Sequence, residues 1–281
     1  MKETYLQELL NVAQETAVSA GQLAKEKFDQ PRIVESKGFR DLVTDVDVAA
    51  QKVIVEGILQ QFPDHGFLPE EADATLPDSG PIIWIIDPID GTTNYSRQQP
   101  VFAISVAATR PVYDAAQTVV AYEPLAGVVY DPMREEMFWV TKGGGAVRKD
   151  SNGRIHPLHT SPVNNLNDAV LCLSLGSTRE KRTQARQWVE ALGEYVFTMR
   201  DIGSATLSLA WVAAGRLDMY INQNIKPWDV AAAALLIEEA GGKFGNTSGN
   251  GFDWVGGAGD CLGTNGRIHS QTVQILVENK L

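Results

Sequence analysis

The chain has 281 residues, of which 44% are hydrophobic and 21% are charged, an ordinary composition for a globular protein. Its 24 basic and 35 acidic residues give a net charge of -11 without any long basic cluster, so we expect no nucleic-acid polymer among its partners. No apolar run approaches the roughly twenty residues that a membrane-spanning helix needs, so we expect no membrane association.

Cysteine usage and the N-terminal segment bear on the compartment. Cys172 and Cys261 form neither a CxxC pair nor a disulfide framework, which indicates a reducing compartment. Residues 1–28 lack the charged-then-apolar organisation of a signal peptide. We therefore expect a cytoplasmic protein.

The first half of the chain predicts helices packed on a sheet. Apolar residues recur every three or four positions between Leu6 and Phe28, and a second helix is predicted from about Asp47 to Phe62. Strand-like runs then follow, at 82–86, 101–107, 126–130 and 137–141. A hairpin turn at Asn152-Gly153 completes a mostly antiparallel sheet.

The second half alternates between the two kinds of element. Strands are predicted at 169–175, 195–199, 217–221 and 261–264, and helices at 179–192, 204–214, 228–240 and 267–278. Such alternation is typical of an α/β fold, so the whole is α/β with an α+β N-terminal half. We expect one domain over 1–281 with half-domains of about 1–155 and 156–281, the seam falling near 143–157.

The segment from Asp87 to Asn94 carries the strongest functional signal. It follows a predicted buried strand, and Pro88 and Gly91 should break regular structure between its two carboxylates, Asp87 and Asp90. The residues after Asp90 could open a short helix whose N–H groups bind an anion. Carboxylates that could bind a cation would then lie beside N–H donors that could bind a phosphate, a combination that favours metal-assisted phosphoryl transfer to water. The simpler alternative is a turn in which an Asp caps a helix.

Two further acidic sites belong with this segment. Glu70-Glu71 lies in a loop, where acidic residues are usually just solvated, and Asp229 opens an apolar helix, where the helix dipole alone would favour it. Together with Asp87 and Asp90, Glu70 and Asp229 would place four negative charges in one pocket and repel a phosphate. Two Mg²⁺ ions would neutralise them and a third would make the site positive, Mg²⁺ being expected because every candidate ligand is an oxygen.

Other phosphatase and hydrolase mechanisms fit poorly. A D-x-D-G-T nucleophile needs acids two residues apart, and the chain has neither a G-x-S-x-G elbow nor a Walker P-loop. His156 and His159 lie in a polar stretch without further zinc ligands, and Gly143–Gly145 is typical of a turn. We therefore expect water to be the nucleophile.

These segments resemble the signatures of the inositol monophosphatase family, the Mg²⁺-dependent, lithium-sensitive sugar-phosphate phosphatases. Residues 87–94 are similar to D-P-x-D-G-T-x-N, and residues 228–242 to W-D-x-A-A…E-A-G-G, with Glu70-Glu71 and Thr44–Asp47 at matching places upstream. The resemblance implies a layered αβαβα sandwich and a homodimer. It also implies Mg²⁺-dependent hydrolysis of a small polyol or sugar phosphate, with inositol 1-phosphate as the default substrate.

The resemblance also assigns roles to individual residues. The first Mg²⁺ would be held by Glu70, Asp87 and the carbonyl of Ile89, the second by Asp87, Asp90 and Asp229, and a third through water with the help of Glu70. Backbone amides of Gly91 and Thr92 would hold the phosphate, while Asp47 and the Thr92 hydroxyl would relay a proton from the attacking water. The leaving group would contact Gly203, Ser204 and Ala205. Lys37 is either the family's mobile-loop lysine or an ordinary surface lysine.

Two positions depart from the family pattern. Pro69 replaces the usual Gly before the metal-binding Glu, and Asn222 stands where inositol enzymes place a Glu. An amide both donates and accepts and carries no charge, so Asn222 could weaken inositol phosphate binding or admit a more negatively charged substrate, and Lys226 favours the latter. Alternatives are therefore histidinol phosphate, fructose 1,6-bisphosphate, and nucleotide 3′- or 2′-phosphates. A non-catalytic binding or regulatory protein would be expected to have lost a metal ligand, and none is lost.

Overall fold

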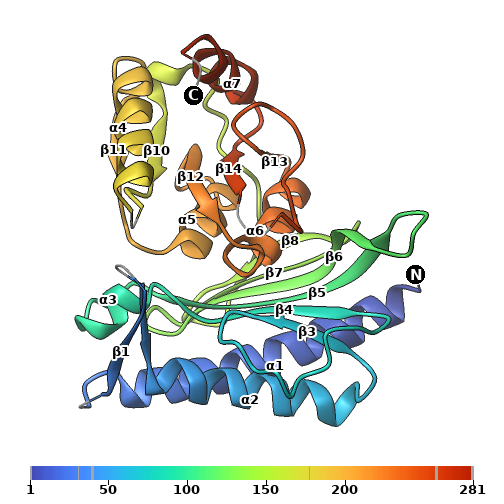
Figure 1. Ribbon diagram of the computed structural model, residues 1–281. Coiled ribbons are helices and arrows are strands. Elements are labelled where there is room, and N and C mark those ends of the chain that lie inside the picture. The colour runs from blue at the N-terminus through green and yellow to red at the C-terminus, as the bar shows by residue number, and fades with distance from the viewer. Residues whose placement is uncertain (1, 31, 39–40, 177, 257–258, 280–281) are drawn as a thin grey trace.

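The computed structural model describes residues 2–30, 32–38, 41–176, 178–256 and 259–279, and in it helices and sheets alternate in five layers (Figure 1). The outer layer on one side is α1 (Glu3–Lys27) with α2 (Asp45–Gln61), which packs on a seven-stranded sheet. A middle layer of α5 (Ala205–Ala213) and α6 (Pro227–Glu239) separates this sheet from a five-stranded one. The last layer is α4 (Arg179–Gly193) with α7 (His269–Glu278), so the predicted αβαβα sandwich is confirmed.

The seven-stranded sheet is antiparallel except for its first pair, as the sequence predicted. Its strands, in both spatial and chain order, are β3 (Gly66–Pro69), β4 (Ile83–Asp90), β5 (Ala103–Tyr113), β6 (Val119–Asp131), β7 (Glu136–Thr141), β8 (Gly145–Lys149) and β9 (Ile155–Pro157). Only β3 and β4 run parallel. The predicted turn at Asn152-Gly153 joins β8 to β9, and Gly153 has the positive φ of +78° that such a turn requires.

One expectation about this sheet holds only in part. Pro88 and Gly91 were expected to break regular structure between Asp87 and Asp90, whereas β4 continues to Asp90 and is buried throughout. The pairing with β5 is irregular between Asp87 and Asp90, and a proline is tolerated at such a bulge because no ladder hydrogen bond needs its missing N–H. The bulge leaves both carboxylates on the strand itself.

The five-stranded sheet has the order β11-β10-β12-β14-β13. Its members are β10 (Val170–Leu173), β11 (Thr198–Arg200), β12 (Met219–Ile225), β13 (Lys243–Gly245) and β14 (Gly259–Thr264). β10 is parallel to β11 and β12, whereas β14 is antiparallel to β12 and β13. Short elements complete the chain, namely β1 (Val34–Gly38), β2 (Asp41–Thr44), α3 (Thr92–Ser96) and the 3₁₀ turn η1 (Leu166–Asp168).

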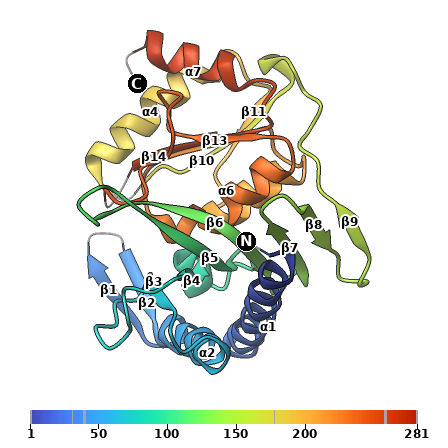
Figure 2. The same ribbon diagram turned by 90° about the vertical axis from the view of Figure 1, so that its right-hand side faces the viewer.

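The middle helices are apolar all round because a sheet covers each of their faces. Residues 230–237 of α6 are all buried, and five of its positions are alanine or valine, which lets the helix lie close to β6 (Figure 2). A side chain at Gly127 of β6 would lie 2.9 Å from Cα of Ala232. We propose that the chain is one domain, since α5 and α6 pack between the sheets of its two halves. Within the described residues, no helix combines the length and apolar character needed to cross a bilayer.

We expect Gly127→Ala to lower the free energy of unfolding by about 1–3 kcal/mol, because α6 must move away from the sheet to admit a methyl group. Gly251→Ala is the matched control, since a Cβ there would meet nothing within 4 Å. Urea unfolding followed by circular dichroism measures both variants. Equal midpoints for the two would contradict the close packing of α6 on β6.

Candidate metal and phosphate site

Three of the predicted metal ligands converge between the two sheets. Asp87 and Asp90 lie at the end of β4, and Asp229 is the third residue of α6. One carboxylate oxygen from each lies within 4.8 Å of the other two. Asp229 also accepts the N–H of Lys226 at 2.8 Å, so its ordinary structural role at the start of a helix is compatible with its place in the cluster.

In its ionised form this cluster needs a cation beside it. Burial raises the pKa of Asp87 well above its usual range, and repulsion from Glu70, Asp90 and Asp229 adds to the effect. The pKa of Asp229 is raised well above its usual range by burial and then by Asp90. Buried carboxylates that repel one another are stable in the ionised form only beside positive charge. The donor set is all oxygen, which fits Mg²⁺.

Asp90 is held in place by the start of α5. The Ser204 hydroxyl and the Thr206 N–H, the latter at 2.9 Å, donate to one carboxylate oxygen, and the Ala205 N–H donates to the other at 3.3 Å. Burial still raises the pKa of Asp90, although these donors act in the opposite direction. Two of the residues predicted to contact the leaving group, Ser204 and Ala205, therefore also orient a predicted metal ligand.

Glu70 directly follows β3 and extends its pairing with β4. Its N–H donates to the carbonyl of Ile86 at 2.9 Å, and its side chain hydrogen-bonds that of Asp87. Pro69 is the last residue of β3 and lies opposite Ile86 without interrupting this arrangement. Gln51 of α2 clamps the backbone of Glu71, accepting its N–H at 3.0 Å and donating to its carbonyl at 2.7 Å. The departure at Pro69 therefore leaves Glu70 beside Asp87.

Asp47 and Thr92 form the contact that the resemblance implies. One oxygen of the fully buried Asp47 accepts hydrogen bonds from the N–H and the hydroxyl of Thr44, which caps α2. The other oxygen accepts the Thr92 hydroxyl at 3.0 Å. Burial raises the pKa of Asp47 despite these donors. The pair therefore links a hydroxyl at the start of α3 to a buried carboxylate that is more basic than usual.

The turn between β4 and α3 needs glycine. Gly91 has a φ of +102°, and a side chain there would lie 3.1 Å from the carbonyl oxygens of Val101 and Gly203. This turn starts α3 directly after Asp90, and the first N–H groups of a helix have no partner inside the helix. Gly91 and Thr92 therefore lie at a helix start, the kind of position at which N–H groups can bind an anion.

A cavity of about 610 Å³ opens beside the acidic cluster. Six residues that were predicted to bind metal or substrate line it, namely Asp90, Gly203, Ser204, Ala205, Asn222 and Asp229. Asn222 donates to the Tyr220 hydroxyl at 2.9 Å and accepts the N–H of Gln223 at 2.7 Å. The Lys226 ammonium instead lies 6.0 Å from the ring centroid of Trp228, and Lys226 is not part of the cavity lining.

The sequence did not predict the roles of two residues that support the site. Asn94 donates to the carbonyls of Val101 and Ile202, each at 2.8 Å, and so ties the first motif to the segment before α5. Besides its bond to Asp90, Thr206 donates its hydroxyl to the carbonyl of Asp229 at 2.9 Å. Asn94 closes the first motif and could have been singled out, but Thr206 belongs to no motif and acts only through contacts distant in sequence.

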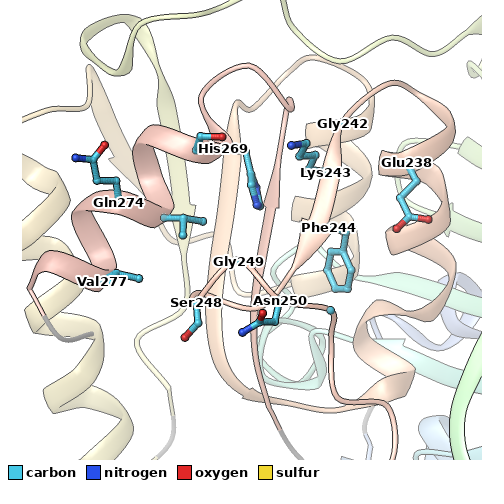
Figure 3. A pocket seen from close by; sticks show the side chains of 13 residues that line it. Glu238, Gly242, Lys243, Phe244, Ser248, Gly249, Asn250, His269, Gln274 and Val277 are labelled. Atoms are coloured by element: carbon cyan, nitrogen blue, oxygen red, sulfur yellow. The ribbon is translucent and has the colours of Figure 1, made fainter.

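Two other features lie apart from this site. The side chain of Lys37 is outside the described part of the structure, so its role stays an expectation. A hollow of about 680 Å³ lies between α7 and β13, lined by residues such as Lys243, Phe244 and His269 (Figure 3). None of the predicted site residues lines it, so the acidic cluster belongs to the other cavity.

Comparison with known proteins identifies the family. The sequence profile of the inositol monophosphatase family matches residues 5–281. The Nus factor SuhB of Escherichia coli (strain K12) is 38% identical over 239 residues, which cover 83% of each chain. Inositol monophosphatase 1 of Solanum lycopersicum is 35% identical over 255 residues, which cover 88% of each chain.

Solved structures agree with this match. The extragenic suppressor protein suhB of Bartonella henselae has a TM-score of 0.84 at 28% identity, covering 96% of this chain and 98% of that one. A dual specific IMPase/NADP phosphatase bound with D-inositol-1-phosphate has a TM-score of 0.77 at 26% identity, covering 96% of each chain. The chain therefore belongs to the inositol monophosphatase family and is a phosphoric monoester hydrolase.

Proposed function

We propose that this protein hydrolyses a small polyol or sugar phosphate monoester with the help of Mg²⁺, inositol 1-phosphate being the default substrate. The observation that carries the proposal is the convergence of Asp87, Asp90 and Asp229 beside a cavity lined by Gly203, Ser204 and Ala205. An ester whose phosphate group lies at the cluster would have room for its alcohol portion in that cavity. The names of the relatives support inositol phosphate, and one structural neighbour is a dual specific IMPase/NADP phosphatase.

The proposed ligands divide between two or three ions. Glu70, Asp87 and the carbonyl of Ile89 would hold the first ion, and Asp87, Asp90 and Asp229 the second, while Glu70 would help a third through water. Bound Mg²⁺ supplies neutralisation of these carboxylates, polarisation of the phosphate and activation of water. The retention of every proposed ligand argues against a non-catalytic binding protein.

The chain's own residues supply positioning and proton transfer. Backbone N–H groups of Gly91 and Thr92 would hold phosphate oxygens at the start of α3. The Thr92 hydroxyl, donating to Asp47 at 3.0 Å, can accept a proton from the attacking water as it passes its own to the carboxylate. The Ser204 hydroxyl and the N–H groups of the first α5 turn keep Asp90 oriented during this step.

Lithium sensitivity, a homodimer and a cytoplasmic location are part of the same proposal. They follow from membership of the family as the sequence resemblance describes it. Both cysteines are free and buried, which is consistent with a reducing compartment.

The proposal is tested by phosphate release from inositol 1-phosphate, histidinol phosphate, fructose 1,6-bisphosphate and nucleotide 3′- and 2′-phosphates, with Mg²⁺ and then with EDTA. We expect Mg²⁺-dependent release that Asp90→Asn lowers by at least about a hundredfold, because the variant loses a metal ligand. Asp114→Asn is the matched control, since Asp114 lies in the exposed turn between β5 and β6. Near-wild-type activity of Asp90→Asn would refute the mechanism, and a preferred ester other than inositol phosphate would implicate Asn222.

The relay makes a separate prediction about Thr92. Thr92→Val keeps the shape of the side chain and removes the hydroxyl, so we expect kcat to fall by about a hundredfold. Thr92→Ser retains the hydroxyl and should retain most of the activity. Steady-state kinetics at saturating Mg²⁺ compare the two variants, and equal kcat values for valine and serine would exclude a role for the hydroxyl.

Stability should depend on pH and Mg²⁺ together. In the metal-free protein the pKa values of Asp87, Asp90 and Asp229 are raised by burial, so between their unfolded and folded values the folded state binds more protons. Their contribution to the free energy of unfolding therefore falls as pH rises through that window. Mg²⁺ binds the ionised carboxylates, so we expect the gain in Tm on adding Mg²⁺ to grow from about pH 5 to about pH 8.

Thermal unfolding of the wild type and of Asp87→Asn, each with Mg²⁺ and with EDTA, isolates this contribution from that of other groups. His65 and His269, whose pKa values burial lowers, contribute with the opposite sign and are common to both proteins. A gain in Tm that is independent of pH, or equal in the two proteins, would contradict the prediction.

A further inference from the structure

The cavity beside the acidic cluster has a second, basic wall. Lys181 and Arg182, in the first turn of α4, line the same cavity as Asp90 and Asp229. A helix N-terminus carries partial positive charge and normally attracts acidic residues, so cations there are unfavourable for the helix itself. Glu180 in the same turn follows this rule, whereas Lys181 and Arg182 depart from it beside a ligand cavity, which is typical of a functional constraint.

This turn is attached to the strand that carries Asn222. The Gln223 side-chain amide donates to the carbonyl of Lys181, and the Thr178 hydroxyl accepts the Lys181 N–H at 3.3 Å. The first contact ties the helix start to β12, and the second caps the helix itself. The Arg182 side chain is exposed and forms no ion pair with any residue within the described ranges, so its guanidinium is available to a ligand.

The other residues that line the cavity also suit a negatively charged ligand. Asn222 and Gln223 both line the cavity with amides, and Asn222 stands at the position where, by the sequence resemblance, inositol enzymes place a Glu. Among the described lining residues, Asp201 is the one carboxylate outside the metal cluster, and it accepts the N–H of Gly203 at 3.2 Å. A neutral polyol would offer no counter-charge to the exposed Arg182 guanidinium.

We propose that Arg182, with Lys181 adding positive charge, forms an anion subsite, so that the substrate is a phosphate monoester that carries a second phosphate group. Arginine binds phosphate through paired N–H donors, which suits this role. The second group remains intact while the phosphate on the acidic cluster is removed. This inference rests on the proposed function and narrows its substrate class.

Matched pairs of esters test the subsite, because the members of a pair differ only in the second phosphate. The pairs are fructose 1,6-bisphosphate with fructose 1-phosphate, and adenosine 3′,5′-bisphosphate with adenosine 3′-phosphate. We expect the wild type to prefer a bisphosphate in kcat/KM, and Arg182→Gln to reduce that preference by about tenfold, as the loss of a charge-assisted hydrogen bond predicts. The pair that shows the effect distinguishes a sugar from a nucleotide substrate.

Arg186→Gln is the matched control. Arg186 lies one turn further along α4, donates to the Thr183 hydroxyl at 3.1 Å and does not line the cavity, so its variant should keep the wild-type preference. A preference that is absent in the wild type, or unchanged in Arg182→Gln, would overturn the subsite while Mg²⁺-dependent hydrolysis of the monophosphates still supports the proposed function.

A binding measurement separates the two proposals if no ester is hydrolysed. Calorimetric titration of the same pairs in the presence of Ca²⁺, which also takes oxygen ligands, reports affinity without turnover. Tighter binding of a bisphosphate that Arg182→Gln weakens by about tenfold would support the subsite although the hydrolytic function had failed. Equal affinities within each pair would overturn it.

Discussion

Mutual repulsion among buried carboxylates is the constraint on which the rest of this structure depends. Asp87, Asp90 and Asp229 lie within reach of one cation, and burial and proximity both raise their pKa values. The raised pKa values mean that protons and a cation compete for these groups. Binding of a metal would therefore be coupled to loss of protons, and the bound cation would offset the negative charge that repels a phosphate.

The layered fold brings these carboxylates together and holds them in place. β4, the second strand of the seven-stranded sheet, supplies two carboxylates, and the N-terminus of α6 in the middle helix layer supplies the third. Small residues set the distance between the seven-stranded sheet and α6, because Gly127 of β6 lies against Ala232 of α6. Thr206 then bonds both Asp90 and the backbone of Asp229, so α5 ties the two sources of charge to each other. Rigid packing resists the repulsion that the carboxylates generate.

Sequence patterns predicted the helices and strands in which hydrophobic residues recur with a clear period, and they predicted the site residues that lie within motifs. The long helices, the antiparallel sheet and the carboxylates at Asp87, Asp90 and Asp229 needed no tertiary information. The short strand β13, and the extension of β4 to Asp90, could not be predicted, because three residues show no period and a bulge accommodates Pro88. Contacts such as Asn94 to Ile202 join positions 108 residues apart, and only the folded chain determines them.

The two ends of the cavity follow different physical rules. At the acidic end, any phosphate ester would meet the same proposed oxygen ligands and the same N–H groups, so chemistry there would be insensitive to the alcohol. At the other end, Asn222, Gln223 and the first turn of α4 would meet only the part of the substrate that is not transformed. Binding energy from that part can be used to position the reacting phosphate. In the proposed function, substrate choice would therefore depend on neutral amides and cations on β12 and α4, which can change without disturbing the proposed metal ligands on β4 and α6.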